Sequence, residues 1–452
     1  MVHREYFSPV HHYFITIKRA DIMTNCLSLV GDDYWYMCDY NQVINACTKE
    51  MFLEHGDNRR LSIRDVKIDE EILKKRIKNL PQIIFEVSEN CNLRCKYCVY
   101  NGYYIHQRSL SPKQLSFETA RKGIDYVYSF INGRKKKEFN LSFYGGEPLL
   151  NFNTIKEIVH YGKERFVDWK LNFNMTTNLT LLDESILNFL AENNFYVVVS
   201  LDGDSDNHDA KRVLPNGNGT HAEVMKHLEH IKKKYNDYFQ EYITFSAVYS
   251  FDLPLQNMHR FFSTHELIKN RPIRFSTVNT SNTTYYEHNL FNKDAYRSDV
   301  KDIFSQVLVK IREEKKQSGY EIFLYQNLVS IGDKLKVRAY TTMGASCLFD
   351  SRLYIDANGC FHICEKINNR FSFGDVDRGF DWPKMTAMAQ EFQKAIKTHC
   401  SNCDIRFLCT QCFVTFAGDG EFKPDPVFCE GQQKAIVANL EKYIECKQER
   451  LI

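Results

Sequence analysis

Three cysteines lie close together in this 452-residue chain, at Cys91, Cys95 and Cys98. Their C-x3-C-x2-C spacing brings three thiols into one small volume. A cubane [4Fe–4S] cluster takes four ligands, usually four cysteine thiolates. Three ligands leave one iron open, and an open metal position is typical of a catalytic site rather than a structural one. The alternative is a zinc knuckle whose fourth ligand lies elsewhere in the chain.

The segment before the cysteines predicts a buried strand. Residues 81–88 read Pro-Gln-Ile-Ile-Phe-Glu-Val-Ser, an apolar run rich in β-branched residues. A cysteine loop directly after the first strand of a parallel sheet lies at the carboxyl end of that strand. Parallel folds place their functional sites at this end.

Strand and helix patterns alternate from residue 81 to about residue 280. Helical patterns separate the predicted strands and cover residues 117–131, 155–166, 184–192 and 222–234. The predicted strands cover residues 83–87, 140–144, 170–175, 196–201, 242–248 and 273–278. Six βα units indicate an α/β fold in which a parallel sheet curves into a partial (β/α)6 barrel, similar to part of a TIM barrel.

The composition excludes some partners. The chain has 59 Lys and Arg against 57 Asp and Glu, so it has no general attraction to nucleic acid or to an anionic membrane. It has no long apolar run, and residues 1–20 lack the apolar core of a signal peptide, so we expect a cytoplasmic protein. In a reducing compartment, clustered cysteines indicate metal or redox sites rather than disulfides.

Polar motifs follow several predicted strands. Gly145 and Gly146 would let the backbone approach a ligand, and Glu147 offers an acceptor for an ammonium group. Arg212 carries a guanidinium fork that suits a carboxylate. His208 is expected to be structural rather than catalytic.

Together these segments resemble the radical S-adenosylmethionine (radical SAM) superfamily. The resemblance implies that SAM chelates the open iron and that its reductive cleavage yields a 5′-deoxyadenosyl radical. It also implies that the GGEP motif, residues 145–148, holds the SAM amino group. Leu179 occupies a position where the family usually has Gly. The SAM-binding residues that the resemblance implies are Tyr97, Gly145, Gly146, Glu147, Asn178, Ser200, Asp202 and Arg212.

A second group of cysteines lies near the end of the chain. On spacing alone, the two CxxC units are also consistent with a zinc ribbon. The longer pattern resembles the SPASM domain, which carries two auxiliary [4Fe–4S] clusters, although the last spacing is two residues rather than three. The resemblance implies a nearer cluster on Cys347, Cys364 and Cys412, and a farther cluster on Cys400, Cys403, Cys409 and Cys429.

The nearer cluster lacks a fourth ligand in this pattern. Cys360 is one candidate, and an iron left open for a substrate thiolate is the other. Cys446 is expected to be unliganded. In related sulfatase-maturing enzymes an Asp follows the cysteine at the position of Cys364 and takes the substrate proton. Glu365 could play that part here, although a surface salt bridge would also explain it.

The resemblance covers roughly residues 81–440 and suggests four regions. Residues 1–80 form an α+β extension, either a simple cap or a leader-peptide-binding module. Residues 81–290 form the radical SAM core, residues 291–340 a bridge, and residues 341–452 the auxiliary-cluster domain. The implied function is a maturase that installs a thioether or carbon–carbon crosslink in a ribosomally made precursor peptide, with electrons from a flavodoxin or ferredoxin. The alternatives are an anaerobic sulfatase-maturing enzyme that makes formylglycine, and a non-catalytic zinc protein that binds peptides.

Overall fold

The largest sheet has eight strands in the order β12-β11-β10-β9-β8-β7-β14-β15. The computed structural model describes the chain except for residues 1–2, 9–12, 21–23, 31–34, 40–41, 48–61, 65, 105–106, 279–282, 290–291, 336–338, 342–348, 367–368, 402, 404, 407, 410–411, 419–420, 450 and 452. Six neighbouring strands pair in parallel, namely β7 Gln82–Ser88, β8 Glu138–Gly145, β9 Lys170–Thr177, β10 Tyr196–Ser200, β11 Ile243–Tyr249 and β12 Ile273–Thr277. Each predicted strand is confirmed to within two residues at either end, and the α/β fold class is confirmed with them.

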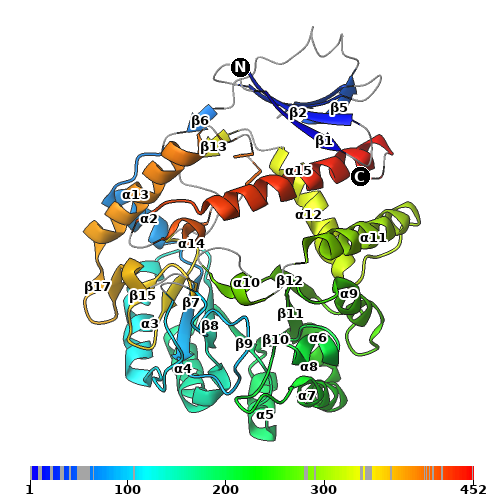
Figure 1. The fold of residues 1–452 in the computed structure, drawn as a ribbon. Coiled ribbons are helices and arrows are strands. Elements are labelled where there is room, and N and C mark those ends of the chain that lie inside the picture. Colours follow the sequence, from blue (N-terminus) through cyan, green and yellow to red (C-terminus); the bar gives the residue numbers. More distant parts are fainter. Residues whose placement is uncertain are drawn as a thin grey trace.

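Helices cover the outer face of this sheet (Figure 1). Two of them begin where the sequence offers a capping side chain: Ser116 accepts from the Thr119 N–H, and Asp183 accepts from the Ile186 N–H. All four predicted helices are present. The helices of this part are α3 Phe117–Ile131, η1 Pro148–Asn151, α4 Phe152–Arg165, α5 Glu184–Glu192, α6 Ser205–Asp209, α7 His221–Lys234, α8 Asn236–Tyr242 and α9 Leu255–Thr264.

The two faces of the sheet differ in polarity. In β10 and β11 the even-numbered residues are half exposed or exposed, and the odd-numbered residues are buried. In β12, Phe275 is buried against Phe262 and Tyr320, whereas Arg274 is exposed on the opposite face. The outer face therefore forms the core with the helices, and the inner face lines an open space.

The C-terminal region contributes two strands to the same sheet. Strand β14 Leu353–Ile355 pairs in parallel with β7, and β15 Phe361–His362 pairs antiparallel with β14. The predicted boundary near residue 341 therefore does not separate two independent sheets. Three residues are too few for a periodicity, so the sequence pattern could not reveal β14. Nearby lie η2 Asn369–Phe371, β16 Gly374–Asp375 and β17 Gly379–Phe380.

Residues before the barrel form a separate antiparallel sheet in the order β1-β2-β3-β4-β5. The side chains of Cys26, Cys38 and Cys47 lie outside the described residues. Helix α2 Glu70–Ile77 follows, and the Asp69 side chain caps it by accepting from the Ile72 N–H. The strands are β1 His3–Ser8, β2 Tyr13–Ala20, β3 Thr24–Val30, β4 Trp35–Asp39, β5 Gln42–Cys47 and β6 Ser62–Arg64, the last paired with β13 Ala339–Thr341.

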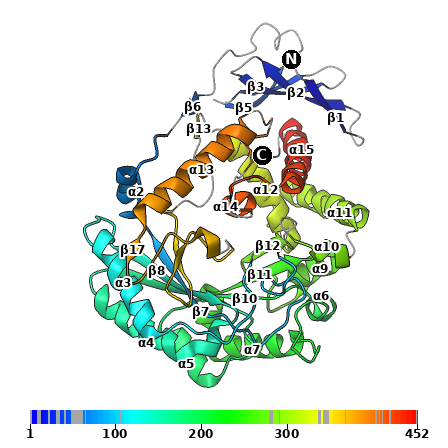
Figure 2. The ribbon, with the colours of Figure 1, turned by 60° about the vertical axis from the view of Figure 1, so that its left-hand side comes forward.

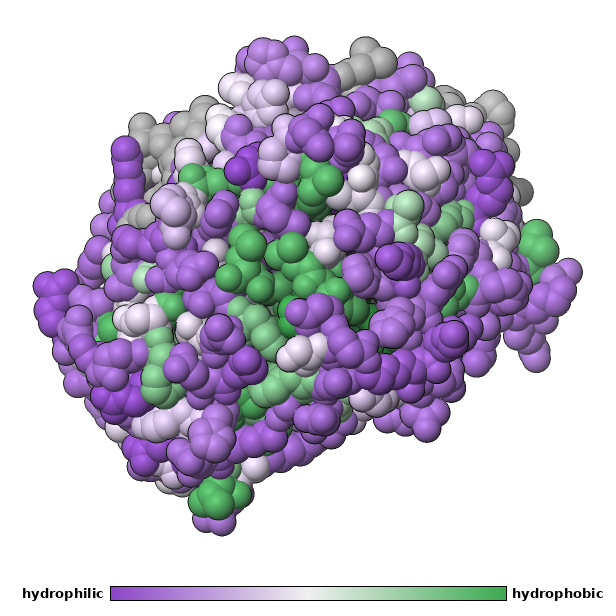
Figure 3. Space-filling view, turned by 90° about the horizontal axis from the view of Figure 1, so that it is seen from below, coloured by the Kyte–Doolittle hydropathy of each residue, from purple (hydrophilic) through white to green (hydrophobic). Residues whose placement is uncertain are grey.

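Three long helices lie between this antiparallel sheet and the barrel, namely α12 Tyr320–Leu335, α13 Trp382–Cys400 and α15 Pro426–Gln448 (Figures 1 and 2). The other helices of this half are α10 Tyr285–His288, α11 Lys293–Arg312 and α14 Phe413–Phe416. Among the described helices, none combines the length and apolar character that a membrane crossing requires. Seen from below, the molecule is mostly hydrophilic, with hydrophobic side chains gathered near the middle of the face (Figure 3).

Candidate functional site

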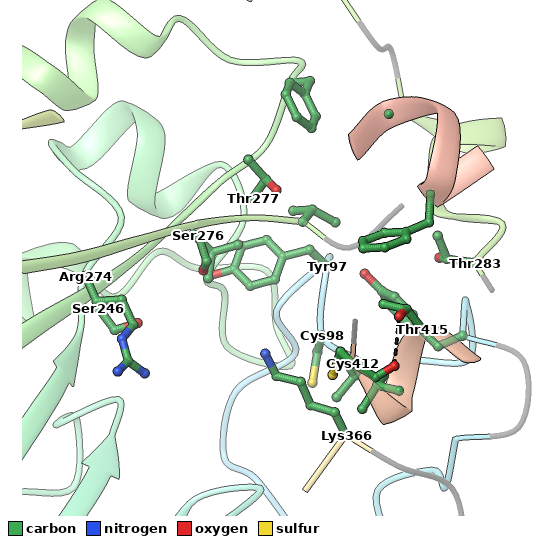
Figure 4. Close-up of a pocket in the computed structure, with 18 of the residues that line it drawn as sticks. Tyr97, Cys98, Ser246, Arg274, Ser276, Thr277, Thr283, Lys366, Cys412 and Thr415 are labelled. Atoms are coloured by element: carbon green, nitrogen blue, oxygen red, sulfur yellow. Dashed lines mark hydrogen bonds between the residues drawn. The ribbon is translucent and has the colours of Figure 1, made fainter. Parts of the chain in front are cut away.

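A cavity of about 2860 Å³ lies at the carboxyl ends of the parallel strands. Cys91, Cys95 and Cys98 line it from the barrel, and Cys364 and Cys412 line it from the C-terminal region. Figure 4 shows Cys98 and Cys412 on the same side of the cavity. Small-molecule sites usually occupy about 300–1000 Å³. This cavity therefore has room for more than one small ligand.

The end of β8 holds the cysteine loop through its backbone. The Gly146 N–H donates to Ser88 O at 2.7 Å, and the Glu147 N–H donates to Asn90 O at 2.8 Å. A Cβ on Gly146 would lie 2.2 Å from Asn90 O, and one on Gly145, whose φ is +144°, would lie 2.3 Å from Ser88 O. The two glycines thus let β8 contact the backbone that leads into Cys91. Residues 88–91 occupy the side where a Cβ would lie, and both glycines also line the cavity, so the expectation that their backbone approaches a ligand stays a prediction.

The three cysteine thiols share an environment that suits a bound cation. Burial raises the pKa of Cys91 to about 12 and that of Cys95 to about 11, and the neighbouring thiols add to the shift at Cys91. The Leu93 N–H donates to Cys91 Sγ at 3.4 Å, and the Tyr100 N–H donates to Cys98 Sγ at 3.5 Å. Iron is bound by thiolates, and a metal centre supplies the positive charge that keeps buried thiols deprotonated. The residues present therefore fit an iron–sulfur cluster.

Within the described part of the chain, no three His, Cys, Asp or Glu side chains are arranged to hold one metal ion.

Glu147 is a buried acceptor with one free position. Its Oε1 accepts from Thr177 Oγ1 at 2.6 Å and from the Leu149 N–H at 3.2 Å, and its Oε2 accepts from the Asn178 N–H at 2.8 Å. Burial raises the pKa of Glu147 to about 7, although these hydrogen bonds oppose the shift. A carboxylate offers about four acceptor positions. One position on Oε2 therefore remains for a ligand.

The segment after β9 contacts the first cysteine. Asn178 Nδ2 donates to Cys91 Sγ at 3.8 Å and to Asn92 Oδ1 at 3.0 Å. Leu179 has a φ of +64°, in the left-handed region that favours glycine, and its side chain is buried. The chain keeps a glycine-like backbone here although the residue is Leu.

Asp202 is shared by two predicted site residues. The Arg212 guanidinium pairs with it through Nε–Oδ2 at 2.8 Å and Nη2–Oδ1 at 3.2 Å, and the Tyr97 hydroxyl also donates to it. The Val248 N–H donates to Oδ1 at 2.9 Å. Arg212 thus already has a carboxylate partner inside the protein, which the sequence did not reveal.

His208 is structural, as expected. Its Nδ1 accepts from the Asp202 N–H at 3.3 Å, and its Nε2 lies 3.0 Å from Thr220 Oγ1. Burial lowers the pKa of His208 well below its usual value, so the ring is neutral. Ser200, by contrast, lines the cavity.

The C-terminal cysteines form two groups among the described residues. Cys364 has Glu365 and Cys412 as electrostatic neighbours, and burial raises its pKa to about 12. Burial likewise raises the pKa of Cys400 to about 12, and its neighbours are Cys403, Cys409 and Cys429. The SPASM resemblance implies the same two sets as cluster ligands, and that assignment stays a prediction; Cys347 lies outside the described residues.

Cys360 does not join either group. Its charged neighbours are Asp356, Asp375, Arg378 and Lys113, and it does not line the cavity. The two carboxylates help burial to raise the pKa of the Cys360 thiol.

Glu365 points a buried oxygen into this region. Its Oε2 has no hydrogen-bond partner among the described residues. The Tyr100 hydroxyl donates to the Glu365 backbone oxygen at 3.4 Å. Burial and the nearby Glu365 carboxylate together raise the pKa of Tyr144 well above its usual value. The sequence motifs did not identify Tyr100 and Tyr144 as site residues. Tyr100 follows Cys98 by two residues, and Tyr144 precedes Gly145.

One protein-family model matches most of the barrel. Residues 85–249 match the family model described as the radical SAM superfamily. This span runs from within β7 to the end of β11 and includes the cysteine loop, Glu147 and Arg212. Residues 85–249 form a radical SAM domain.

Relatives of the radical SAM domain include named enzymes. The radical SAM cyclopropyl synthase TigE of Paramaledivibacter caminithermalis is 27% identical over 385 residues, covering 78% of this chain and 72% of TigE. A cysteine-type anaerobic sulfatase-maturating enzyme of Clostridium novyi is 29% identical over 166 residues, covering 35% of this chain and 43% of that enzyme. An uncharacterised protein of Methanocaldococcus jannaschii is 32% identical over 160 residues, and this chain spans about half of it, 51% of its length.

A solved structure shares the fold beyond the radical SAM domain. "Native anSMEcpe with bound AdoMet" superposes with a TM-score of 0.62 at 20% identity, covering 82% of this chain and 98% of that one. At this identity the likeness shows a common fold. It extends over the C-terminal region as well as the barrel.

Proposed function

We propose that this chain is a radical SAM peptide maturase that installs a thioether or carbon–carbon crosslink in a ribosomally made peptide. One observation carries the proposal. Cys91, Cys95 and Cys98 and the pair Cys364 and Cys412 face one cavity of about 2860 Å³. When bound there, the reduced cluster and SAM supply a 5′-deoxyadenosyl radical that takes a hydrogen from a peptide carbon.

The barrel residues have separate roles in this proposal. Cys91, Cys95 and Cys98 hold the SAM-binding cluster, and Asn178 steadies the sulfur of Cys91. Glu147 receives the SAM amino group on the free position of Oε2. Asp202 and Arg212 fix Tyr97, whose ring lies in the cysteine loop beside the expected adenine position.

The C-terminal cysteines hold two auxiliary [4Fe–4S] clusters in this proposal. Cys347, Cys364 and Cys412 bind the nearer one, and Cys400, Cys403, Cys409 and Cys429 bind the farther one. Cys364 and Cys412 line the cavity and Cys360 does not, which supports a nearer cluster with a site open to a substrate thiolate.

A precursor peptide is the proposed substrate. A cavity much larger than a small-molecule site supports a peptide segment beside SAM. The unpaired Oε2 of Glu365 is suited to take a proton from that segment. Residues 1–80 are proposed to bind a leader sequence, and a cytoplasmic flavodoxin or ferredoxin to supply the electrons.

Formylglycine formation is the second candidate. The sulfatase-maturating enzyme of Clostridium novyi, 29% identical over 166 residues, favours it. Against it stands Glu365, because the resemblance described above places an Asp there in sulfatase-maturing enzymes.

Coexpression with candidate peptides encoded beside the gene tests the proposal. Mass spectrometry of the recovered peptide should show the loss of two hydrogens with every sulfur retained. Oxidation of a cysteine to formylglycine removes its sulfur, and oxidation of a serine leaves an aldehyde that a hydrazide reagent captures. Either result would favour the second candidate. An unchanged peptide, from every candidate and with active SAM cleavage, would argue against a crosslinking maturase.

A further inference from the structure

Three adjacent strands place a polar row on the inner face of the barrel. In the register of the sheet, Ser200 of β10 lies beside Ser246 of β11, and Ser246 lies beside Arg274 of β12. Residues side by side in paired strands point to the same face. All three line the cavity, and so does Ser276, two residues beyond Arg274.

Arg274 differs from the other arginines near the site. Its side chain is exposed to the cavity and makes no hydrogen bond or ion pair with another residue in the described ranges. Arg212, in contrast, is paired with Asp202 at 2.8 Å. Arg271, three residues before Arg274, donates to backbone oxygens, including that of Phe239 at 2.6 Å. Arg274 is therefore a cation in the cavity without an internal counterion in the described part of the chain.

The position of Arg274 separates it from the cysteines. In Figure 4, Arg274 and Ser246 lie on the far side of Tyr97 from Cys98 and Cys412. A counter-charge for the thiolates would be expected beside the cysteines, where Arg212 is an electrostatic neighbour of Cys95. Arg274 instead faces the part of the cavity beyond Tyr97, where a bound molecule would extend away from the iron.

We propose that Arg274, with the hydroxyls of Ser246 and Ser276, is a receptor for a carboxylate of a molecule bound in the cavity. A guanidinium presents parallel N–H donors that match a carboxylate in two-point geometry, and serine hydroxyls beside it can complete the set. The inference rests on the proposed function, which brings two carboxylate-bearing molecules into the cavity. The first source, SAM, holds its carboxylate on the open iron beside the cysteines, so the second source, the peptide, supplies the carboxylate for Arg274 through an acidic side chain or its C-terminus.

Binding to the anaerobically reconstituted protein tests the first source. The probes are SAM and decarboxylated SAM, titrated calorimetrically into wild type, Arg274→Gln and Arg260→Gln. Arg260, exposed on α9, does not line the cavity and serves as the control. Because the SAM carboxylate is held at the iron, Arg274→Gln should bind SAM as tightly as wild type and Arg260→Gln do. A ten-fold or greater weakening of SAM, with decarboxylated SAM unchanged, would overturn the assignment of the carboxylate to the peptide.

Peptide binding tests the second source. The probes are two short synthetic peptides that differ only in one Glu or Gln, added to the SAM-loaded protein. If the carboxylate comes from the peptide, wild type should prefer the Glu peptide about ten-fold or more, and Arg274→Gln should lose that preference. Arg274→Lys should retain part of it, because the charge remains without the planar fork.

The outcomes separate this inference from the proposed function. Unchanged binding of both peptides in a folded Arg274→Gln protein would overturn the carboxylate receptor and leave the maturase proposal intact. A wild-type protein that binds neither SAM nor peptide would contradict the proposed function and this inference with it. Thermal unfolding of Arg274→Gln should match wild type, since Arg274 is unpaired among the described residues.

Discussion

Arg212 and Asp202 form a buried two-point ion pair, with Nε–Oδ2 at 2.8 Å and Nη2–Oδ1 at 3.2 Å. The sequence suggested that the Arg212 guanidinium would meet a carboxylate of SAM. In the structure its carboxylate is Asp202, which also accepts from the Tyr97 hydroxyl and the Val248 N–H. The pair thus ties the cysteine loop to the ends of β10 and β11, and its first role is to position that loop.

Removing one partner of this pair should destabilise the fold. Arg212→Gln leaves the Asp202 carboxylate buried without its cation, which costs about 3–5 kcal/mol in the free energy of unfolding. The double variant Asp202→Asn with Arg212→Gln should lose less, because no charge is then left unpaired. Urea unfolding of the anaerobic protein measures both. Equal losses in the single and double variants would show that the ion pair is not the cause.

Glu147 should make stability and SAM binding depend on pH. Burial raises its pKa from 4.5 to about 7, so between these values the folded state keeps a proton that the unfolded state releases. The contribution of Glu147 to stability therefore falls as the pH rises from about 4.5 to about 7. The ammonium group of SAM needs the carboxylate form, so SAM should bind several-fold more tightly at pH 7.5 than at pH 6.

The matched variant for this prediction is Glu147→Gln. It should flatten both pH profiles over this range and weaken SAM by about 1.5–3 kcal/mol at pH 7.5, the value of a charged hydrogen bond. Calorimetric titration with SAM at the two pH values measures this. A Glu147→Gln protein with the wild-type pH dependence would remove Glu147 from the amino-group site.

Leu179 should respond to substitution differently from an ordinary core leucine. Its φ of +64° strains any residue except glycine by about 1–2 kcal/mol, while its side chain is 1% exposed. Leu179→Ala should cost about 2–5 kcal/mol through lost packing and keep the strain. Leu179→Gly loses the same packing but relieves the strain, so it should be at least as stable as Leu179→Ala.

Leu187 provides the control for this comparison. It is equally buried, at 1%, but lies within helix α5. There the glycine variant should be less stable than the alanine variant by about 0.5–1 kcal/mol. Chemical unfolding of the four variants shows, at each position, whether the glycine or the alanine variant is more stable. The same order of stability at both positions would contradict a strained Leu179.

The sequence predicted the barrel well because its signals are local. Runs of strand-forming residues and the helical spacing of apolar residues act over a few positions, and they predicted the six strands and four helices. The caps Ser116 and Asp183, found in the structure, are equally local. The C-terminal strand β14 was not predicted, because three residues carry no period and its place beside β7 depends on a contact between residues 353–355 and 83–85.

The partners of individual side chains were harder to predict than the helices and strands. Arg212 and Asp202 are ten residues apart, and nothing in their spacing distinguishes an internal ion pair from two ligand-binding groups. Gly145 and Gly146 were predicted to let a ligand approach, and nothing in their spacing showed that the backbone of residues 88–91 also lies against them. Arg274 carries no motif and became visible only when the sheet register placed it beside Ser246.

The auxiliary cysteines should separate radical formation from product formation. Cys364→Ala should still release 5′-deoxyadenosine from SAM, since the barrel motifs suffice for cleavage, but should yield little or no crosslinked peptide. Cys360→Ala should retain iron content and product close to wild type, because Cys360 faces Asp356 and Asp375 rather than Cys364. Iron analysis and product mass measure both variants. A Cys360→Ala protein that matches Cys364→Ala would instead make Cys360 the fourth ligand.

Cleavage of SAM by the Cys95→Ala variant tests the central claim most directly. Wild type and variant are reconstituted anaerobically, reduced with dithionite and supplied with SAM, and 5′-deoxyadenosine is quantified alongside bound iron. We predict that wild type forms 5′-deoxyadenosine, and that Cys95→Ala forms none and loses about one cluster of iron while remaining folded. Formation of 5′-deoxyadenosine at the wild-type rate by Cys95→Ala, or its absence in iron-loaded wild type, would contradict a SAM-cleaving cluster on Cys91, Cys95 and Cys98.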